Sequence, residues 1–115
     1  MESEKVVVAL EALAQASRLG IFRLLVEAGP NGLSAGQIAA HLRLPAPTLS
    51  FHLSQLKHAQ LASCQRASRS LIYSANFGTM NELVAFLTEN CCGVGPELCA
   101  PAGVSLRAGK RGKRK

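Results

Sequence analysis

The sequence predicts a mainly α-helical domain that carries one β-hairpin. Apolar residues recur with helical spacing across most of residues 5–58, and residues 61–75 then alternate in the manner of strands. A tight polar turn at residues 66–70 divides the alternating stretch into two strands. Because a helix that leads directly into a hairpin is typical of a winged helix-turn-helix, we predict this fold class.

The first helix is expected at residues 5–16. Its apolar stripe should consist of Val6, Leu10 and Leu13. Val7 and Val8 lie beside this stripe, and this surplus of apolar side chains indicates a second packing surface on the same helix. A second helix is expected at residues 18–28, with Ser17 as its N-cap. Its inward-facing residues should be Leu19, Phe22, Leu25 and Val26.

The helix-turn-helix itself is expected at residues 34–58. Ser34 and Gln37 have the spacing of a capping box, so they should open a short helix that ends at Leu42. The next helix should begin near Pro47, because the fixed φ of proline suits the first helical turn. Its buried stripe should consist of Leu49, Leu53 and Leu56.

The opposite face of this last helix is polar and carries no carboxylate, which suits a surface that reads DNA. Base-edge contacts are expected from Ser50, His52 and Gln55, and phosphate contacts from Thr48, Lys57, Arg66 and Arg69. Phe51 points outward, where it either touches a thymine methyl group or is partly buried at an irregular helix start. The alternative is a generic amphipathic helix and hairpin whose polar face is merely solvated.

The distribution of charge favours the DNA-binding interpretation. No Asp or Glu occurs between Glu27 and Glu82. The same interval contains the basic residues Arg43, Lys57, Arg66 and Arg69. The net charge of +6 is weaker evidence, because residues 107–115 alone carry six basic residues and the rest of the chain is balanced.

Two functional classes are disfavoured by the sequence. No apolar run approaches membrane-spanning length, and the N-terminus is acidic where a signal peptide is basic. We therefore expect a cytoplasmic protein without a membrane segment. No nucleophile, base and acid set, phosphate-binding loop or cofactor fingerprint appears, so an enzyme is not expected.

Residues 17–74 resemble the ArsR/SmtB family of repressors, whose pattern has an S-R-L helix start, a T-x-S-x-H-L recognition helix and a hairpin that ends in Tyr. In this sequence the pattern falls on Ser17, Arg18, Leu19, Thr48, Ser50, His52, Leu53 and Tyr73. The resemblance implies a homodimer that binds a palindromic double-stranded operator and leaves it when a metal or metalloid binds.

The resemblance also implies dimerisation through the first and last helices. A final apolar helix is expected at residues 80–90. It carries Leu83, Val84, Phe86 and Leu87. Residues 1–92 would then form the dimerisation and DNA-binding domain, and residues 93–115 a flexible tail rich in Cys, Gly, Pro and basic residues.

Three cysteines, Cys91, Cys92 and Cys99, follow the predicted last helix within nine residues. Three thiolates match the pyramidal coordination of As(III), so we expect these residues to bind As(III) as an inducer. Arsenic-responsive relatives with a paired cysteine after the last helix and a third in the tail add to this resemblance. Cys64, in the hairpin, is expected to be a small buried side chain outside the site.

Other effectors and functions remain open at this stage. Sb(III), Cd(II) and Pb(II) also suit thiolate-rich sites, whereas Zn(II) would need a fourth ligand, for which Cys64, Glu89 and Glu97 are candidates. The cysteines could instead form a redox pair in a thiol-responsive regulator. A DNA binder that senses nothing and depends on the basic tail is a further alternative.

Overall fold

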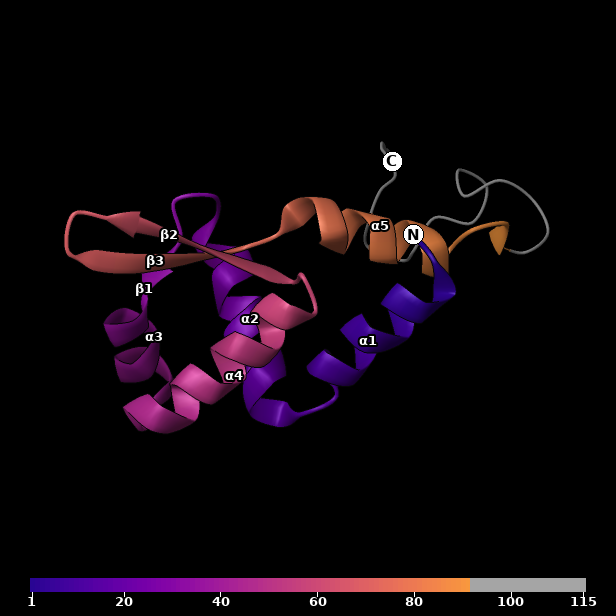
Figure 1. The fold of residues 1–115 in the computed structure, drawn as a ribbon. Coiled ribbons are helices and arrows are strands. Elements are labelled where there is room, and N and C mark those ends of the chain that lie inside the picture. The colour runs from indigo at the N-terminus through magenta and orange to yellow at the C-terminus, as the bar shows by residue number, and fades with distance from the viewer. Residues whose placement is uncertain (92–115) are drawn as a thin grey trace, which may run out of the picture. The chain divides into compact units, whose positions relative to one another are not determined.

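The computed structural model describes residues 1–91. In chain order the elements are α1 (Ser3–Leu13), α2 (Ala16–Ala28), β1 (Leu33–Ser34), α3 (Ala35–Leu42), α4 (Ala46–His58), β2 (Ala62–Ala67), β3 (Ser70–Ala75) and α5 (Phe77–Leu87), as Figure 1 shows. The chain divides into two units, of which the first is Met1–Leu83 and the second begins at Val84. The predictions for Cys92, Cys99 and residues 93–115 lie outside the described residues.

The predicted fold class is confirmed, because the helices and the β-hairpin wing follow one another along the chain in the order that the sequence indicated. The strands form an antiparallel sheet in the order β1-β3-β2, in which Cys64 lies opposite Tyr73 on the neighbouring strand. The sequence did not predict β1, because two residues are too few to show strand alternation. No helix within residues 1–91 is long and apolar enough to cross a membrane.

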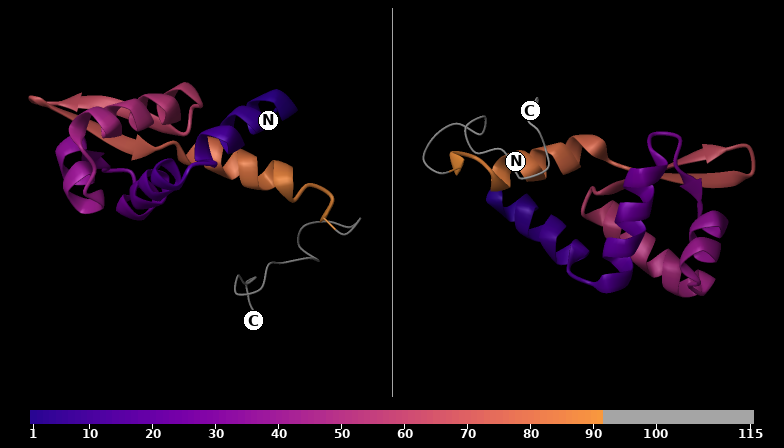
Figure 2. Two further views of the ribbon diagram at one scale, coloured as in Figure 1. Left: turned by 90° about the horizontal axis from the view of Figure 1, so that it is seen from below. Right: turned by 180° about the vertical axis from the view of Figure 1, so that it is seen from behind.

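The core of the first unit lies where α2, α3 and α4 gather on one side of the sheet (Figures 1 and 2). Its largest fully buried side chains are Ile21, Leu25, Ile38, Leu49, Leu53, Leu56 and Leu61. The predicted stripe of α4 is therefore confirmed at all of its positions. Burying each of these leucines contributes about 1.5–3 kcal/mol to folding, so the stripe fixes which face of α4 points inward.

The helix-turn-helix begins and turns as the sequence predicted. Ser34 accepts from the backbone N–H of Gln37, while the Gln37 side chain accepts from the backbone N–H of Ser34, so the capping box is present. Arg43 ends α3 in the left-handed region, with a φ of 58°. Pro45 is the N-cap of α4, and Pro47 falls within its first turn.

Several predictions for the other helices are wrong in detail. Leu10 and Leu19 are exposed, because α1 packs through Val6 and Ala9 and α2 packs through Ile21, Phe22 and Leu25. The cap of α2 is Gln15 rather than Ser17, since the Gln15 side chain accepts from the backbone N–H of Arg18 at 2.9 Å. Counting large apolar residues overlooked Ala9, whose small side chain permits close packing.

The last helix also begins earlier than predicted, at Phe77 rather than Met80. The reason is a local cap, because the Asn76 side chain accepts a hydrogen bond from the backbone N–H of Thr79 at 3.1 Å. Asn76 follows β3 directly, so the wing passes into α5 without a loop.

Gly32 provides the clearest test of the sheet. Its φ is +71°, and a β-carbon there would collide with the carbonyl oxygen of Tyr73 on β3. We expect Gly32→Ala to lower the free energy of unfolding by about 2 kcal/mol or more, measured by urea denaturation. Gly20→Ala is the matched control, because nothing lies within 4 Å of a β-carbon on that helical residue. Equal stability of the Gly32 variant and wild type would contradict the β1–β3 arrangement.

Candidate nucleic-acid interface

The outward face of α4 supplies most of the predicted DNA contacts. Thr48, Ser50, Phe51, Gln55 and Lys57 are all exposed, as the face opposite the buried leucine stripe requires. Phe51 is 58% exposed, which matches the outward orientation expected of it rather than burial at the helix start. None of these side chains is acidic, so the helix can approach a negatively charged groove.

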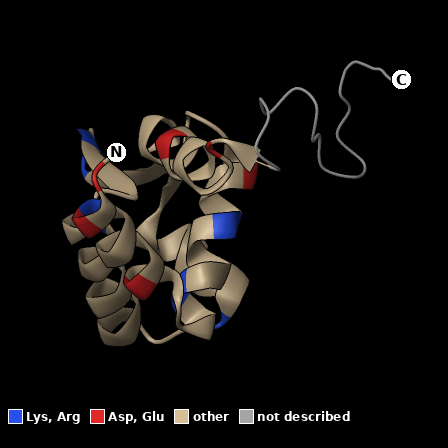
Figure 3. Cartoon of the chain, turned by 90° about the vertical axis from the view of Figure 1, so that its right-hand side faces the viewer, with Lys and Arg blue, Asp and Glu red and all other residues tan. Residues whose placement is uncertain are grey.

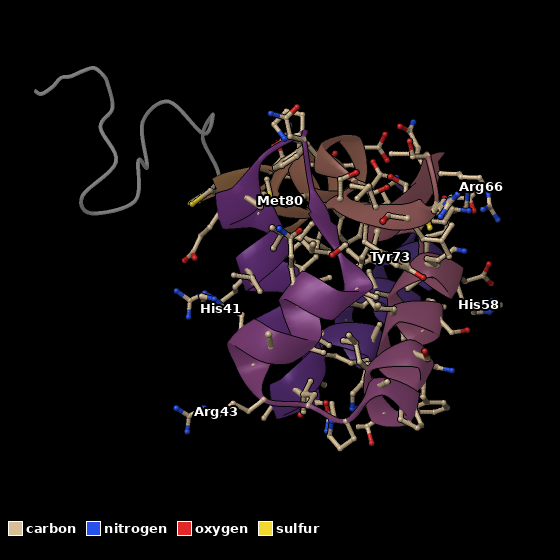
Figure 4. All side chains as sticks on the ribbon, turned by 90° about the vertical axis from the view of Figure 1, so that its left-hand side faces the viewer. His41, Arg43, His58, Arg66, Tyr73 and Met80 are labelled. Carbon is tan, nitrogen blue, oxygen red and sulfur yellow. The ribbon has the colours of Figure 1, made fainter. Side chains whose placement is uncertain are left out.

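The wing carries the two predicted arginines on a tighter hairpin than expected. Ala67 pairs with Ser70, so the turn contains only Ser68 and Arg69, and Ser68 adopts a φ of 59°. Arg66 lies on β2 rather than in the turn, and both arginines are exposed. Figure 4 shows Arg66 extending outward from the wing. The guanidinium groups are therefore accessible to phosphate.

The acidic residues of the described chain lie on other elements than α3, α4 and the wing. Every Asp or Glu of the described chain lies on α1, α2 or α5 or immediately beside α1 or α5 (Figure 3). The turn between α3 and α4 adds Arg43, which projects outward in Figure 4. The wing and the turn before α4 present positive charge with no carboxylate on these elements, whereas Glu11 of α1 lines a pocket with Gln55 and His58 near the end of α4.

His52 does not lie where the sequence analysis placed it. Its side chain is only 7% exposed and belongs to the core, so the prediction of a base-edge contact is wrong. The ring Nδ1 lies 3.4 Å from Nη1 of Arg18 on α2. Histidine is polar, and the prediction took its polarity as a sign of exposure, whereas the arginine provides a partner that permits burial.

The protonation state of His52 follows from this contact. Arginine only donates hydrogen bonds, so Nδ1 can accept one only while it carries no proton. Burial lowers the pKa of His52, and the Arg18 guanidinium lowers that pKa further. The lowered pKa and the contact with Arg18 both favour the neutral imidazole.

Sequence reasoning missed the role of Arg18, although a signal for it was present. Arg18 and His52 both belong to the family pattern, in the helix start and the recognition helix respectively. Positions that occur together in one pattern can contact each other in the fold, and here they do.

The wing contains a second polar contact, between Cys64 and Tyr73. These residues face each other across β2 and β3, and both are partly buried. Burial raises the pKa of the Tyr73 hydroxyl, and the hydrogen bond with Cys64 raises it further. Cys64 is less buried than the sequence suggested. It lies on β2 and is therefore part of the wing.

The predicted thiol site is described only at its first residue. Cys91 follows α5 in a short turn, where its backbone N–H donates to the Thr88 carbonyl at 3.0 Å. Within residues 1–91, no group of three His, Cys, Asp or Glu side chains is arranged to hold a metal ion. Cys92 and Cys99 lie outside the described residues.

The known proteins that this chain resembles are regulators of transcription. A family described as a helix-turn-helix domain matches residues 13–65. The transcriptional activator HlyU of Vibrio cholerae is 29% identical over 90 residues, which cover 78% of this chain and 81% of HlyU. The transcriptional repressor SdpR of Bacillus subtilis is 31% identical over 55 residues, which cover 48% of this chain and 61% of SdpR.

Solved structures of transcriptional regulators also superimpose on this chain. A structure of HlyU from Vibrio cholerae superimposes with a TM-score of 0.60 at 32% identity, covering 76% of this chain and 97% of HlyU. An ArsR-like transcriptional regulator from Rhodococcus superimposes with a TM-score of 0.69 at 21% identity, covering 78% of this chain and 82% of that protein.

The neutral, buried state of His52 predicts a pH-dependent stability. In the unfolded chain the imidazole has its ordinary pKa of about 6.5, whereas in the folded protein the pKa is lower. As the pH falls below the unfolded value, the unfolded chain binds the proton first, so the free energy of unfolding decreases until the pH passes the folded pKa. Urea denaturation between pH 7.5 and pH 5, at fixed protein concentration, should show this decrease.

His52→Asn provides the comparison for this experiment. The variant cannot take up the proton, while His41 and His58 remain exposed in both proteins. We expect the variant to lose less stability than wild type over the same pH interval. If the free energy of unfolding changes equally with pH in the two proteins, the assignment of His52 as a buried, neutral residue is refuted.

Proposed function

The chain belongs to the ArsR family of winged helix-turn-helix transcriptional regulators, and on this basis we propose that it is a homodimeric repressor that releases its operator when As(III) binds. The relatives are DNA-binding regulators rather than enzymes. The observation that carries the DNA-binding part is the acid-free surface that joins the outward face of α4 to the arginines of the wing.

This surface divides the DNA contacts into two kinds. Ser50 and Gln55 have polar groups that can pair with base edges in the major groove, and Phe51 can contact a thymine methyl group. Thr48, Lys57, Arg66 and Arg69 are suited to phosphate, because a hydroxyl or a positive charge recognises the backbone without reading sequence. Ser50, Phe51 and Gln55 of the helix would thus set specificity, while the wing, together with Thr48 and Lys57 of the helix, would set affinity.

Exposed apolar side chains support the homodimer. On α1 these are Val7, Val8 and Leu10. On α5, Val84 and Leu87 are 54% and 59% exposed. Large apolar groups that a monomer leaves in water on two terminal helices are typical of an interface between copies. A palindromic operator would then place one α4 in each of two successive major grooves.

The donor chemistry of the cysteines supports the effector. Cys91, Cys92 and Cys99 provide three sulfur ligands in a short segment, and As(III) and Sb(III) prefer such ligands. Zn(II) is a poorer match, because it favours four ligands. Cd(II) and Pb(II) suit thiolates as well and belong in the same titration. Binding at the end of α5 would alter the helix that we assign to the dimer interface.

Alanine substitutions should separate the two kinds of DNA contact. Ser50→Ala and Gln55→Ala should each reduce discrimination between operator and random duplex by about 1–3 kcal/mol. Arg66→Ala and Arg69→Ala should weaken binding to both duplexes and lower the salt dependence by about one ion each. Fluorescence anisotropy at several salt concentrations, on an operator selected from a random duplex library, measures both effects.

Arg23→Ala is the control for loss of charge, because Arg23 is exposed on α2 outside the helix-turn-helix and wing. Its effect on both duplexes should be small. If all four variants lose affinity equally on operator and random DNA, the division between reading helix and phosphate-binding wing is wrong.

The effector is tested by adding As(III), Sb(III), Cd(II), Pb(II) or Zn(II) to the operator complex. As(III) should release DNA from wild type and from Cys64→Ser, whereas Cys91→Ser, Cys92→Ser and Cys99→Ser should stay bound. A coupling of about 1–3 kcal/mol corresponds to a 5- to 150-fold loss of operator affinity. Release by oxidant but not by As(III) would favour a redox regulator, and a normal response in all four variants would exclude the cysteine site.

A further inference from the structure

One side chain, Arg18, contacts two other helices at the centre of the first unit. It lies in the first turn of α2. Its Nε donates to the carbonyl oxygen of Ala12 on α1 at 2.7 Å, and its Nη1 lies 3.4 Å from Nδ1 of His52 on α4. We call this pair of contacts the Arg18 bridge.

The contact with Ala12 completes the C-terminal end of α1. Ala12 is in the last turn, where carbonyl oxygens have no partner within the helix. That turn contains no basic residue of its own, so Arg18 supplies both the hydrogen-bond donor and the positive charge that a helix C-terminus favours. The backbone N–H of Arg18 is held in turn by the Gln15 side chain. This hydrogen bond holds the backbone of Arg18, so its side chain extends from a fixed position at the start of α2.

The contact with His52 fixes the rotation of α4 about its own axis. Successive residues of an α-helix are 100° apart, so residues on the buried and outward faces rotate together. His52 is buried between the exposed residues Ser50 and Gln55. Its ring also packs against the exposed ring of Phe51, with centroids 5.8 Å apart. A rotation that withdrew the imidazole from Arg18 would turn these outward side chains away from their groove.

We propose that Arg18 is a positioning residue for operator recognition, because its bridge from Ala12 to His52 fixes the orientation of α4 relative to α1. This inference rests on the proposed function, in which α1 contributes to the dimer interface and α4 reads the operator. In such a dimer the two copies of α4 must stand about 34 Å apart, one turn of DNA. A change of angle between α1 and α4 moves both copies at once, and so affects specific binding more than binding to random DNA.

The test compares operator and random-duplex affinities, measured by fluorescence anisotropy, and uses their ratio as the readout. Arg18→Met removes both contacts at similar length, and His52→Leu removes the acceptor while filling the core. Each should lower the ratio about tenfold, the size expected for a hydrogen bond to a charged group. The double variant should lose no more than the larger single loss, because the contact that His52→Leu removes is already absent in Arg18→Met.

A conservative variant separates positioning from general damage to the fold. The side-chain oxygen of Asn can stand near the position of Nδ1, so His52→Asn should keep a ratio within about threefold of wild type. Arg18→Lys should fold, since it keeps the positive charge, yet it should lower the ratio because its single ammonium nitrogen cannot reach both Ala12 and His52 as the separate Nε and Nη1 of arginine do. Arg23→Met, which removes an exposed charge from the same helix, should leave the ratio unchanged.

The outcomes distinguish this inference from the proposed function. If wild type selects no duplex from the library, the proposed function fails, and a positioning role in operator recognition falls with it. If wild type selects an operator but the two losses multiply in the double variant, or fall equally on both duplexes, the bridge does not position α4. If His52→Asn is no better than His52→Leu, the acceptor at Nδ1 is irrelevant and the inference is overturned. Circular dichroism confirms that each variant is folded at the assay temperature.

Discussion

Burial of the leucine stripe on α4 is the constraint on which the rest of the structure depends. Leu49, Leu53 and Leu56 are almost completely withdrawn from water, and together they are worth several kcal/mol. That burial decides which face of α4 points inward and so leaves the polar face outward, while the exact orientation within this packing is left to contacts such as that between Arg18 and His52. The function assigned to this surface thus begins with hydrophobic packing, and the polar residues acquire their role because the leucines occupy the other face.

The sequence predicted most of this arrangement because its signals were periodic. The leucine stripe, the capping box at Ser34 and the hairpin each depend on residue spacing, which the fold preserved. Contacts between distant segments gave no such signal. His52 appeared to belong to the outward face, because periodicity cannot show that Arg18, 34 positions earlier, would provide a buried partner. Ala9 was overlooked for a related reason, since close packing favours a small residue that hydropathy does not single out.

The positions of the charged residues are better evidence for DNA binding than the net charge of the chain. The net charge of +6 arises from the basic residues at 107–115, since the remainder of the chain is balanced. What suits the described domain to DNA is the exclusion of carboxylates from α3, α4 and the wing, with the acidic residues on or beside α1, α2 and α5. Repulsion from a single misplaced carboxylate can cancel the attraction of one arginine, so this exclusion matters more than the total.

The route from the proposed sensor to the DNA-binding surface is short along the chain. From Cys91 it runs back along α5 to Asn76, which caps that helix through the N–H of Thr79. The backbone N–H of Asn76 also donates at 2.9 Å to the carbonyl oxygen of Leu61, between α4 and β2. Asn76 therefore joins the start of α5 to the end of the recognition helix and to the base of the wing. Each such hydrogen bond is worth about 1 kcal/mol, and a regulatory coupling requires about 1–3 kcal/mol. A change in α5 that disturbed both bonds would suffice in energy to alter DNA binding.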